Sequence, residues 1–182
     1  MKLTLRMTAV LALLAIVAVA SEVALRSAHA AAPTADAALL NEVRDRSEID
    51  ALMWRYVRAL DSLDEGAYAD LYTADGSFGS GARAAQGRDA LKKMILDVKQ
   101  TQAERAAKGG GPAPKMYHVI TNPYLEFVDH DHARLHAYWM TAFAAADPQS
   151  QPRLAAVGRS VDHLVRVQGH WLIQMRDVAP TD

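Results

Sequence analysis

Hydrophobic residues recur with helical spacing between residues 47 and 60. At intervals of three and four residues they gather on one side of an amphipathic helix, and this side is expected to be buried. Trp54 and Asp61 lie seven residues apart on one flank of that side, where a carboxylate beside a large aromatic ring is expected to form a pocket wall. The recurring positions are Ile49, Leu52, Met53, Tyr56, Val57 and Leu60.

Less regular stretches lie on both sides of this helix. Residues 31–46 are predicted to form a linker that leads into one or two additional helical turns. After the helix, Gly66 opens a short second helix, Asp75-Gly76 forms a turn, and a strand follows at Phe78.

A third helix and four strands are predicted in the second half of the chain. The helix starts at Gly87, becomes wholly polar near Lys99 and ends at GGGPAP, residues 109–114, because prolines and consecutive glycines do not extend a helix. From Lys115 the period changes to two, which is typical of strands. Helices followed by a meander of strands predict an α+β fold, with the helices packed on the concave face of a curved antiparallel sheet. The strands are expected at 115–128, 133–143, 154–167 and 170–178.

Composition and charge narrow the class of protein. The chain has 182 residues, of which 51% are hydrophobic and 23% charged, and this fits one globular domain with its own core. The formal net charge is −1 and no long basic run is present, so a nucleic-acid partner is not expected. The sequence has no cysteine, which excludes disulfides, thiolate metal sites and cysteine nucleophiles within it.

Residues 1–30 have the pattern of a secretory signal peptide. Basic residues precede an apolar run from Met7 to Ala20, and Ala28-His29-Ala30 supplies a small-x-small cleavage site, with a second candidate site at Ala20. A run of about 14 residues is shorter than the roughly 20 that span a bilayer, so no stable membrane span is expected after cleavage. Loss of Lys2, Arg6 and Arg26 with Glu22 changes the formal charge from −1 to −3. The mature protein is therefore expected to be periplasmic or secreted.

A set of positions across residues 45–180 carries a family resemblance. They are Ile49, Leu52, Tyr56, Ala59-Leu60-Asp61, Asp64, Tyr68, Leu71, Asp75-Gly76, Phe78, His118, Asn122, Gly158-Arg159, Asp162, Trp171 and Arg176. Together they resemble the SnoaL-like polyketide-cyclase family of the nuclear transport factor 2-like superfamily, whose members include scytalone dehydratase, ketosteroid isomerase and limonene epoxide hydrolase. The resemblance implies that residues 47–182 form a cone-shaped α+β barrel around an apolar pocket, with no cofactor.

The resemblance also implies site residues. Asp61 and His118 stand where scytalone dehydratase has an aspartate after its first helix and a histidine in its first long strand, and Ser160 stands where it has a polar pocket asparagine. Tyr56 resembles the oxyanion tyrosine of ketosteroid isomerase. The candidate catalytic residues are Asp61, His118 and Tyr56, and the candidate substrate-binding residues are Trp54, Asn122 and Ser160.

Departures from the family pattern and simpler structural roles limit this assignment. Leu60 replaces the tyrosine that precedes the aspartate, and the strand at 78–80 lacks the second tyrosine, so scytalone is a poor substrate candidate. Ser80 lies near the position of the base of ketosteroid isomerase, which argues against steroid isomerisation. A packed aromatic ring at Tyr56, a capping carboxylate at Asp61 and a core histidine at His118 are the structural alternatives.

A cluster of histidines and aspartates at 129–136 suggests metal coordination at first sight. Asp129-His130-Asp131-His132 with His136 places imidazoles two residues apart, a spacing that can bind zinc. The cluster lies at a predicted hairpin tip, where polar side chains stay solvated, so no metal site is predicted.

Two functional classes remain open from the sequence. The favoured class is a cofactor-independent lyase or isomerase type of enzyme, in which an Asp/His pair transfers a proton on a hydrophobic cyclic small molecule by dehydration, isomerisation, cyclisation or epoxide opening. The alternative is a non-catalytic protein that binds a small molecule or a partner in the same apolar cone. A homodimer is expected in either case, because both faces of the strand at 133–143 are substantially apolar.

Overall fold

The computed structural model describes residues 34–109, 113–145 and 147–181. The predicted signal peptide, with both candidate cleavage sites, lies outside the described residues. The chain divides into two compact units, Met1–Asn41 and Glu42–Asp182. Thr34, in the first unit, precedes helix α2, Ala35–Ser62, whose residues from Glu42 onward belong to the second unit. The carbonyl and hydroxyl oxygens of Thr34 accept hydrogen bonds from Ala38 N and Ala37 N at 2.9 and 3.3 Å. The helical turns predicted before residue 47 are thus the start of the same continuous helix.

Three further helical segments are described in the second unit. Helix α3, Glu65–Asp70, is capped by Asp64, whose Oδ1 accepts a hydrogen bond from Ala67 N at 2.9 Å. A short 3-10 turn, η1, covers Gly81–Arg83, and helix α4 covers Arg88–Gly109. Among the described helices, none is both long and apolar enough to cross a membrane.

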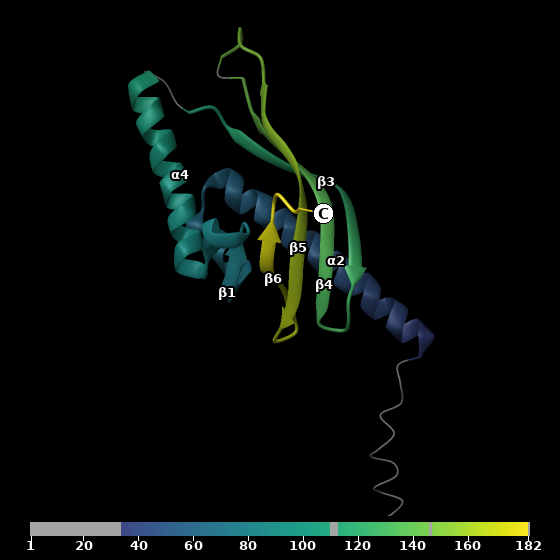
Figure 1. Cartoon of the computed structure of the whole chain (residues 1–182). Coiled ribbons are helices and arrows are strands. Elements are labelled where there is room, and N and C mark those ends of the chain that lie inside the picture. The colour runs from purple at the N-terminus through teal and green to yellow at the C-terminus, as the bar shows by residue number, and fades with distance from the viewer. Residues whose placement is uncertain (1–33, 110–112, 146, 182) are drawn as a thin grey trace, which may run out of the picture. The chain divides into compact units, whose positions relative to one another are not determined.

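One six-stranded sheet has the order β2-β1-β6-β5-β4-β3 (Figure 1). The four long strands are β3, Met116–Phe127, β4, His132–Phe143, β5, Arg153–Val167, and β6, His170–Asp177, and they pair antiparallel in the predicted order. Strand β1, Tyr72–Phe78, pairs parallel with β6, and the two-residue β2, Ala85–Gln86, pairs antiparallel with β1. The predicted turn at Asp75-Gly76 lies within β1, where its register with β6 shifts between Tyr72 and Ser77.

The hydrophobic core lies between the sheet and the three helices. The helical positions identified by their spacing are buried: Ile49, Leu52, Met53, Tyr56 and Val57 have at most 8% of their surface exposed, and Leu60 packs against the same core. The core also includes the α3 side chain Tyr68, the α4 side chains Leu91 and Ile95, and the sheet residues Leu164, Trp171 and Ile173. The α+β fold with helices on one face of a curved sheet is therefore confirmed, although the described sheet does not close into a complete barrel.

Candidate functional site

Asp61, in the last turn of α2, and His118, near the start of β3, lie in direct contact. Asp61 Oδ1 accepts a hydrogen bond from the His118 backbone N at 2.9 Å and lies 2.8 Å from His118 Nδ1. Only 12% of the Asp61 side chain and 18% of the His118 side chain are exposed. Because one carboxylate oxygen contacts both the backbone and the ring of the same residue, it fixes the imidazole orientation as well as the position of the strand.

The histidine lines a pocket of about 260 Å³ between α2 and the concave face of the sheet. Tyr56, His118, Thr141 and Arg176 supply its polar groups. The remaining lining residues are apolar: Leu60, Phe78, Ile120, Trp139, Ala156 and Val178. An apolar wall with a few convergent polar groups is the usual composition of a small-molecule site.

A buried ion pair forms part of the pocket wall. The Arg176 guanidinium donates to Asp162 Oδ2, and its central carbon lies 4.5 Å from the centroid of the Tyr56 ring. Asp162 is fully buried, and burial raises the pKa of its carboxyl to about 6, an effect that Arg176 offsets only in part. The pair therefore places a cationic group beside the pocket, at a desolvation cost to the carboxylate.

Three tyrosines extend this polar group towards α3 and β1. The Tyr56 and Tyr68 ring centroids are 5.4 Å apart, those of Tyr68 and Tyr72 are 5.3 Å apart, and the Tyr68 and Tyr72 hydroxyls are 2.9 Å from each other. Burial raises the pKa of all three hydroxyls, so they stay protonated near neutral pH. Tyr56 packs in the hydrophobic core and also lines the pocket. Its position is therefore compatible with both sequence-based interpretations, a packed aromatic ring and a site residue.

The candidate substrate-binding residues do not line the pocket that contains His118. Trp54 is 67% exposed on α2. Asn122 has a φ of 52° and lies where the β3–β4 register shifts between Thr121 and Tyr124, so the strand alternation that would align it with His118 is interrupted. Ser160 is buried, and together with Asn122 it lines a separate cavity of about 520 Å³.

Arg176 and Trp139 are pocket residues to which the sequence analysis gave no functional role. Arg176 is one of the positions that carry the family resemblance, but an arginine in a strand is most often solvated. Only the pairing of β5 with β6 places it opposite Asp162. Trp139 lies over Gly158, where an added Cβ would come within 2.6 Å of the indole ring. Its Nε1 donates to the carbonyl oxygens of Arg159 and Val178 at 3.0 and 3.1 Å. The adjacent glycine, in a strand otherwise rich in larger residues, is the signal that could have indicated this close approach.

The histidine and aspartate cluster at the β3–β4 hairpin makes local pairs. His130 Nδ1 lies 2.7 Å from Asp131, and His132 Nδ1 lies 2.9 Å from Asp129, with all four side chains at least half exposed. Within the described residues, no group of three or more histidine, aspartate or glutamate side chains is arranged to hold a metal ion.

Comparison with known proteins assigns the chain to a family. The family model of the SnoaL-like domain matches residues 41–177 of this chain. The comparison with curated proteins finds no match. A nuclear transport factor 2-like protein with a cystatin-like fold from Novosphingobium aromaticivorans is 25% identical, with 84% of this chain and 92% of that chain covered and a TM-score of 0.64.

Two further solved structures have the same fold at lower identity. A protein from Catenulispora acidiphila in complex with S-DNPA is 21% identical, with 74% and 91% of the two chains covered and a TM-score of 0.58. A candidate scytalone dehydratase from Novosphingobium aromaticivorans is 19% identical, with 78% and 87% covered and a TM-score of 0.60. The family match covers most of the chain, and the resemblance inferred from the sequence is confirmed: this protein belongs to the SnoaL-like domain family.

Proposed function

We propose that this protein is a cofactor-independent acid–base enzyme in which His118, oriented by Asp61, transfers a proton on a hydrophobic small molecule. The observation that supports this most directly is the double contact of Asp61 Oδ1 with the backbone N and Nδ1 of His118. A carboxylate that accepts the Nδ1 proton selects one tautomer and leaves Nε2 as the nitrogen available to a substrate. Imidazole is the side chain best suited to give and take a proton near neutral pH.

Arg176 and Tyr56 supply the second element of the mechanism. Both line the same pocket as His118, and the guanidinium is held against the Tyr56 ring and Asp162. A fixed cation in a largely apolar pocket stabilises negative charge that develops on a substrate oxygen. Dehydration, isomerisation, cyclisation and epoxide opening all need proton transfer beside such an oxygen. The candidate scytalone dehydratase among the similar structures supports this reaction class.

Non-catalytic binding of an apolar ligand is the second candidate function. Six of the ten residues that line the pocket are apolar, and this composition suits retention of a ligand as well as reaction. The similar Catenulispora protein holds S-DNPA in its structure. The pocket volume of about 260 Å³ is slightly below the range of about 300–1,000 Å³ that is usual for ligand sites, so the bound portion is compact.

A substrate screen with matched variants separates the two functions. Cyclic hydroxy-ketones, enones and epoxides are incubated with the purified protein, and turnover is measured for Asp61→Asn and His118→Gln. We expect His118→Gln to lose about 10²–10⁴-fold in rate, and Asp61→Asn to lose at least about tenfold because the imidazole loses its anionic partner. Asp50→Asn on the exposed side of α2 and His170→Gln, whose native side chain is 80% exposed, are the matched controls.

Circular dichroism verifies that each variant is folded. Full activity in both folded variants would show that the Asp61–His118 pair is structural. Tight binding of compounds from the same screen without turnover of any of them would favour the binding function.

We also propose that the protein is exported after cleavage behind Ala30. The basic start, the apolar run and the Ala28-His29-Ala30 site support this proposal. Intact mass spectrometry of protein recovered from a secreting host measures the cleavage point. A soluble product that retains residues 1–30 would contradict it.

A further inference from the structure

A third cleft, larger than the two spaces described above, lies between α4 and the outer ends of β3, β4 and β5. Its volume is about 1020 Å³, and it shares no lining residue with the pocket that contains His118. Met116 and Phe143, which pair across β3 and β4, form its sheet wall, and α4 forms the opposite wall along most of its length, from Ala90 to Gly109. We call this space the outer cleft.

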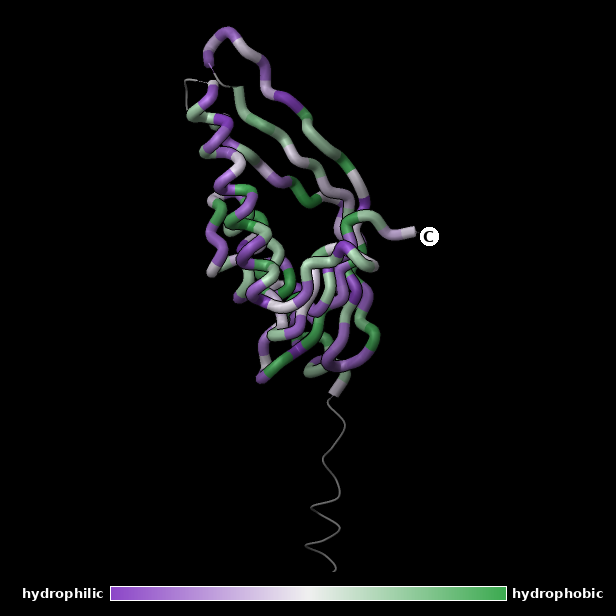
Figure 2. The backbone as a smooth tube through the Cα atoms, turned by 60° about the vertical axis from the view of Figure 1, so that its left-hand side comes forward, coloured by the Kyte–Doolittle hydropathy of each residue, from purple (hydrophilic) through white to green (hydrophobic). Residues whose placement is uncertain are grey.

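The sequence of α4 explains why the outer cleft is open. In the first half of the helix Leu91 and Ile95 are buried, but from Asp97 to Gly109 no residue is buried. The residues of that second half that line the cleft include Thr101, Gln102 and Arg105, and polar residues at these positions cannot pack against an apolar sheet. Figure 2 shows hydrophilic positions recurring along the helix.

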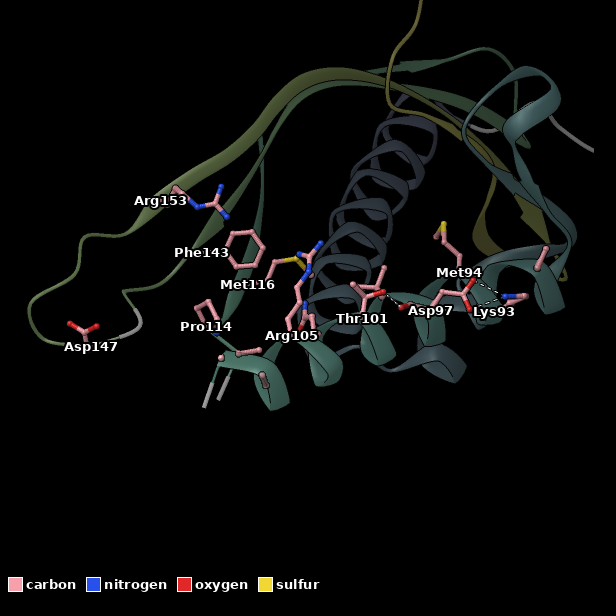
Figure 3. Close-up of a pocket in the computed structure, with 16 residues that line it drawn as sticks. Lys93, Met94, Asp97, Thr101, Arg105, Pro114, Met116, Phe143, Asp147 and Arg153 are labelled. Carbon is pink, nitrogen blue, oxygen red and sulfur yellow. Dashed lines mark hydrogen bonds and ion pairs between the residues drawn. The ribbon is translucent and has the colours of Figure 1, made fainter. Parts of the chain in front are cut away.

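Each wall of the outer cleft carries an arginine close to its apolar side chains. Arg105 reaches from α4 towards Met116 and Phe143, and Arg153 projects from β5 beside Phe143 (Figure 3). The Arg153 guanidinium carbon lies 5.0 Å from the centroid of the Phe143 ring. Arginine at an aromatic ring presents a planar fork of donors that matches a carboxylate.

The other charged residues of the outer cleft are already engaged. Lys93 donates to both carboxylate oxygens of Asp97, at 2.8 and 2.7 Å. Asp147 accepts hydrogen bonds from Gln149 N and Ser150 N within its own loop, away from the guanidinium groups (Figure 3). Within residues 34–109, 113–145 and 147–181, Arg105 and Arg153 form no ion pair with a carboxylate, so their charge is available to a ligand.

We propose that the outer cleft binds a small organic anion with an apolar body, such as an alkyl or aryl carboxylate. The carboxylate contacts Arg105 and Arg153, and the apolar body lies against Met116 and Phe143. The volume is at the upper end of the usual range for ligand sites, so it accommodates such a molecule without displacement of the core. This site does not depend on the proposed chemistry at His118, because the two spaces have separate linings.

Isothermal titration calorimetry with octanoate and its neutral analogue octanamide tests the proposal. We expect octanoate to bind more tightly than octanamide. Added salt should lower the affinity for octanoate and leave the affinity for octanamide unchanged. Arg105→Gln and Arg153→Gln are each expected to weaken octanoate binding about three- to fivefold, as for exposed ion pairs, and to leave octanamide binding unchanged. Phe143→Ala is expected to weaken the binding of both compounds, because it removes part of the apolar wall.

Two control variants locate the site. Arg83→Gln removes an exposed arginine of η1 that does not line the outer cleft, and it is expected to leave octanoate affinity unchanged. His118→Gln is also expected to leave octanoate affinity unchanged, so failure of the proposed catalysis and failure of this site give different results. Absence of octanoate binding, equal affinity for octanamide, or unchanged octanoate affinity in both arginine variants would each overturn the proposal.

Discussion

Asp162 and Arg176 form the most costly polar arrangement in the described core. Within the described residues, Asp162 Oδ1, Arg176 Nε and the neighbouring Ser160 Oγ are buried without a hydrogen-bond partner. A buried ion pair with unsatisfied atoms contributes little net stability, because the desolvation of both charges opposes their attraction. The pair places the Arg176 guanidinium against the Tyr56 ring and in the pocket wall, where an apolar pair of similar volume would supply no charge.

The Asp162 carboxyl is expected to make stability fall as pH rises through the acid range. Burial raises its pKa from 3.8 to about 6 in the folded protein, so the folded state binds the proton more tightly than the unfolded chain. Its contribution is therefore fully present below about pH 4 and is lost by about pH 6, with a total change of roughly 3 kcal/mol. Urea unfolding of the wild type and of Asp162→Asn at several pH values between 4 and 7 measures this change.

The difference in free energy of unfolding between the wild type and Asp162→Asn separates the contribution of Asp162 from that of the other carboxylates. Asn cannot titrate, so the stability of the wild type relative to Asp162→Asn should fall by roughly 3 kcal/mol as pH rises from 4 to 6. Asp50→Asn, at an exposed position of α2, should show no such trend relative to the wild type. A stability difference between wild type and Asp162→Asn that is constant with pH would contradict the assigned pKa.

Sequence reasoning predicted single residues well where a regular period places them. The helical spacing around Tyr56 identified a buried face, and the family pattern directed attention to Asp61 and His118, which the structure brings into contact. Asn122, four residues after His118, would share its face in a regular strand, but the irregular backbone at Asn122 interrupts that alternation. The partnership of Asp162 with Arg176 depends on strand register, which periodicity alone does not give.

The long helices and strands were predictable because their hydrophobic residues recur with a clear period. The contacts between these elements were harder to predict. The strands at β3, β4, β5 and β6 begin and end within two residues of the expected positions. The parallel pairing of β1 with β6 joins segments about 100 residues apart, and no local pattern encodes it. The polar second half of α4 was visible in the sequence, but its consequence, an open cleft against β3 and β4, requires the position of the sheet.

The unit from Glu42 to Asp182 covers one face of its sheet with helices and leaves apolar residues on the other face exposed. Val119 of β3 pairs with Met140 of β4, which pairs with Val157 of β5, so these side chains form a row across the sheet. Val119 and Val157 are 41% and 61% exposed, and the adjacent Tyr138 is 53% exposed. Contiguous apolar surface of this kind on a protein often marks an interface.

We expect two copies of the protein to associate through this exposed row of β3, β4 and β5. A two-fold dimer places the same surface of each copy against the other, and burial of apolar area stabilises it. Multi-angle light scattering at tens of micromolar should give twice the mass of one chain. Val119→Lys combined with Val157→Lys should give the monomer mass, because four added charges face one another in the dimer. Leu96→Lys, at a 45% exposed position of α4, is the matched control and should remain dimeric. A monomeric wild type, or a double variant that stays dimeric, would exclude this interface.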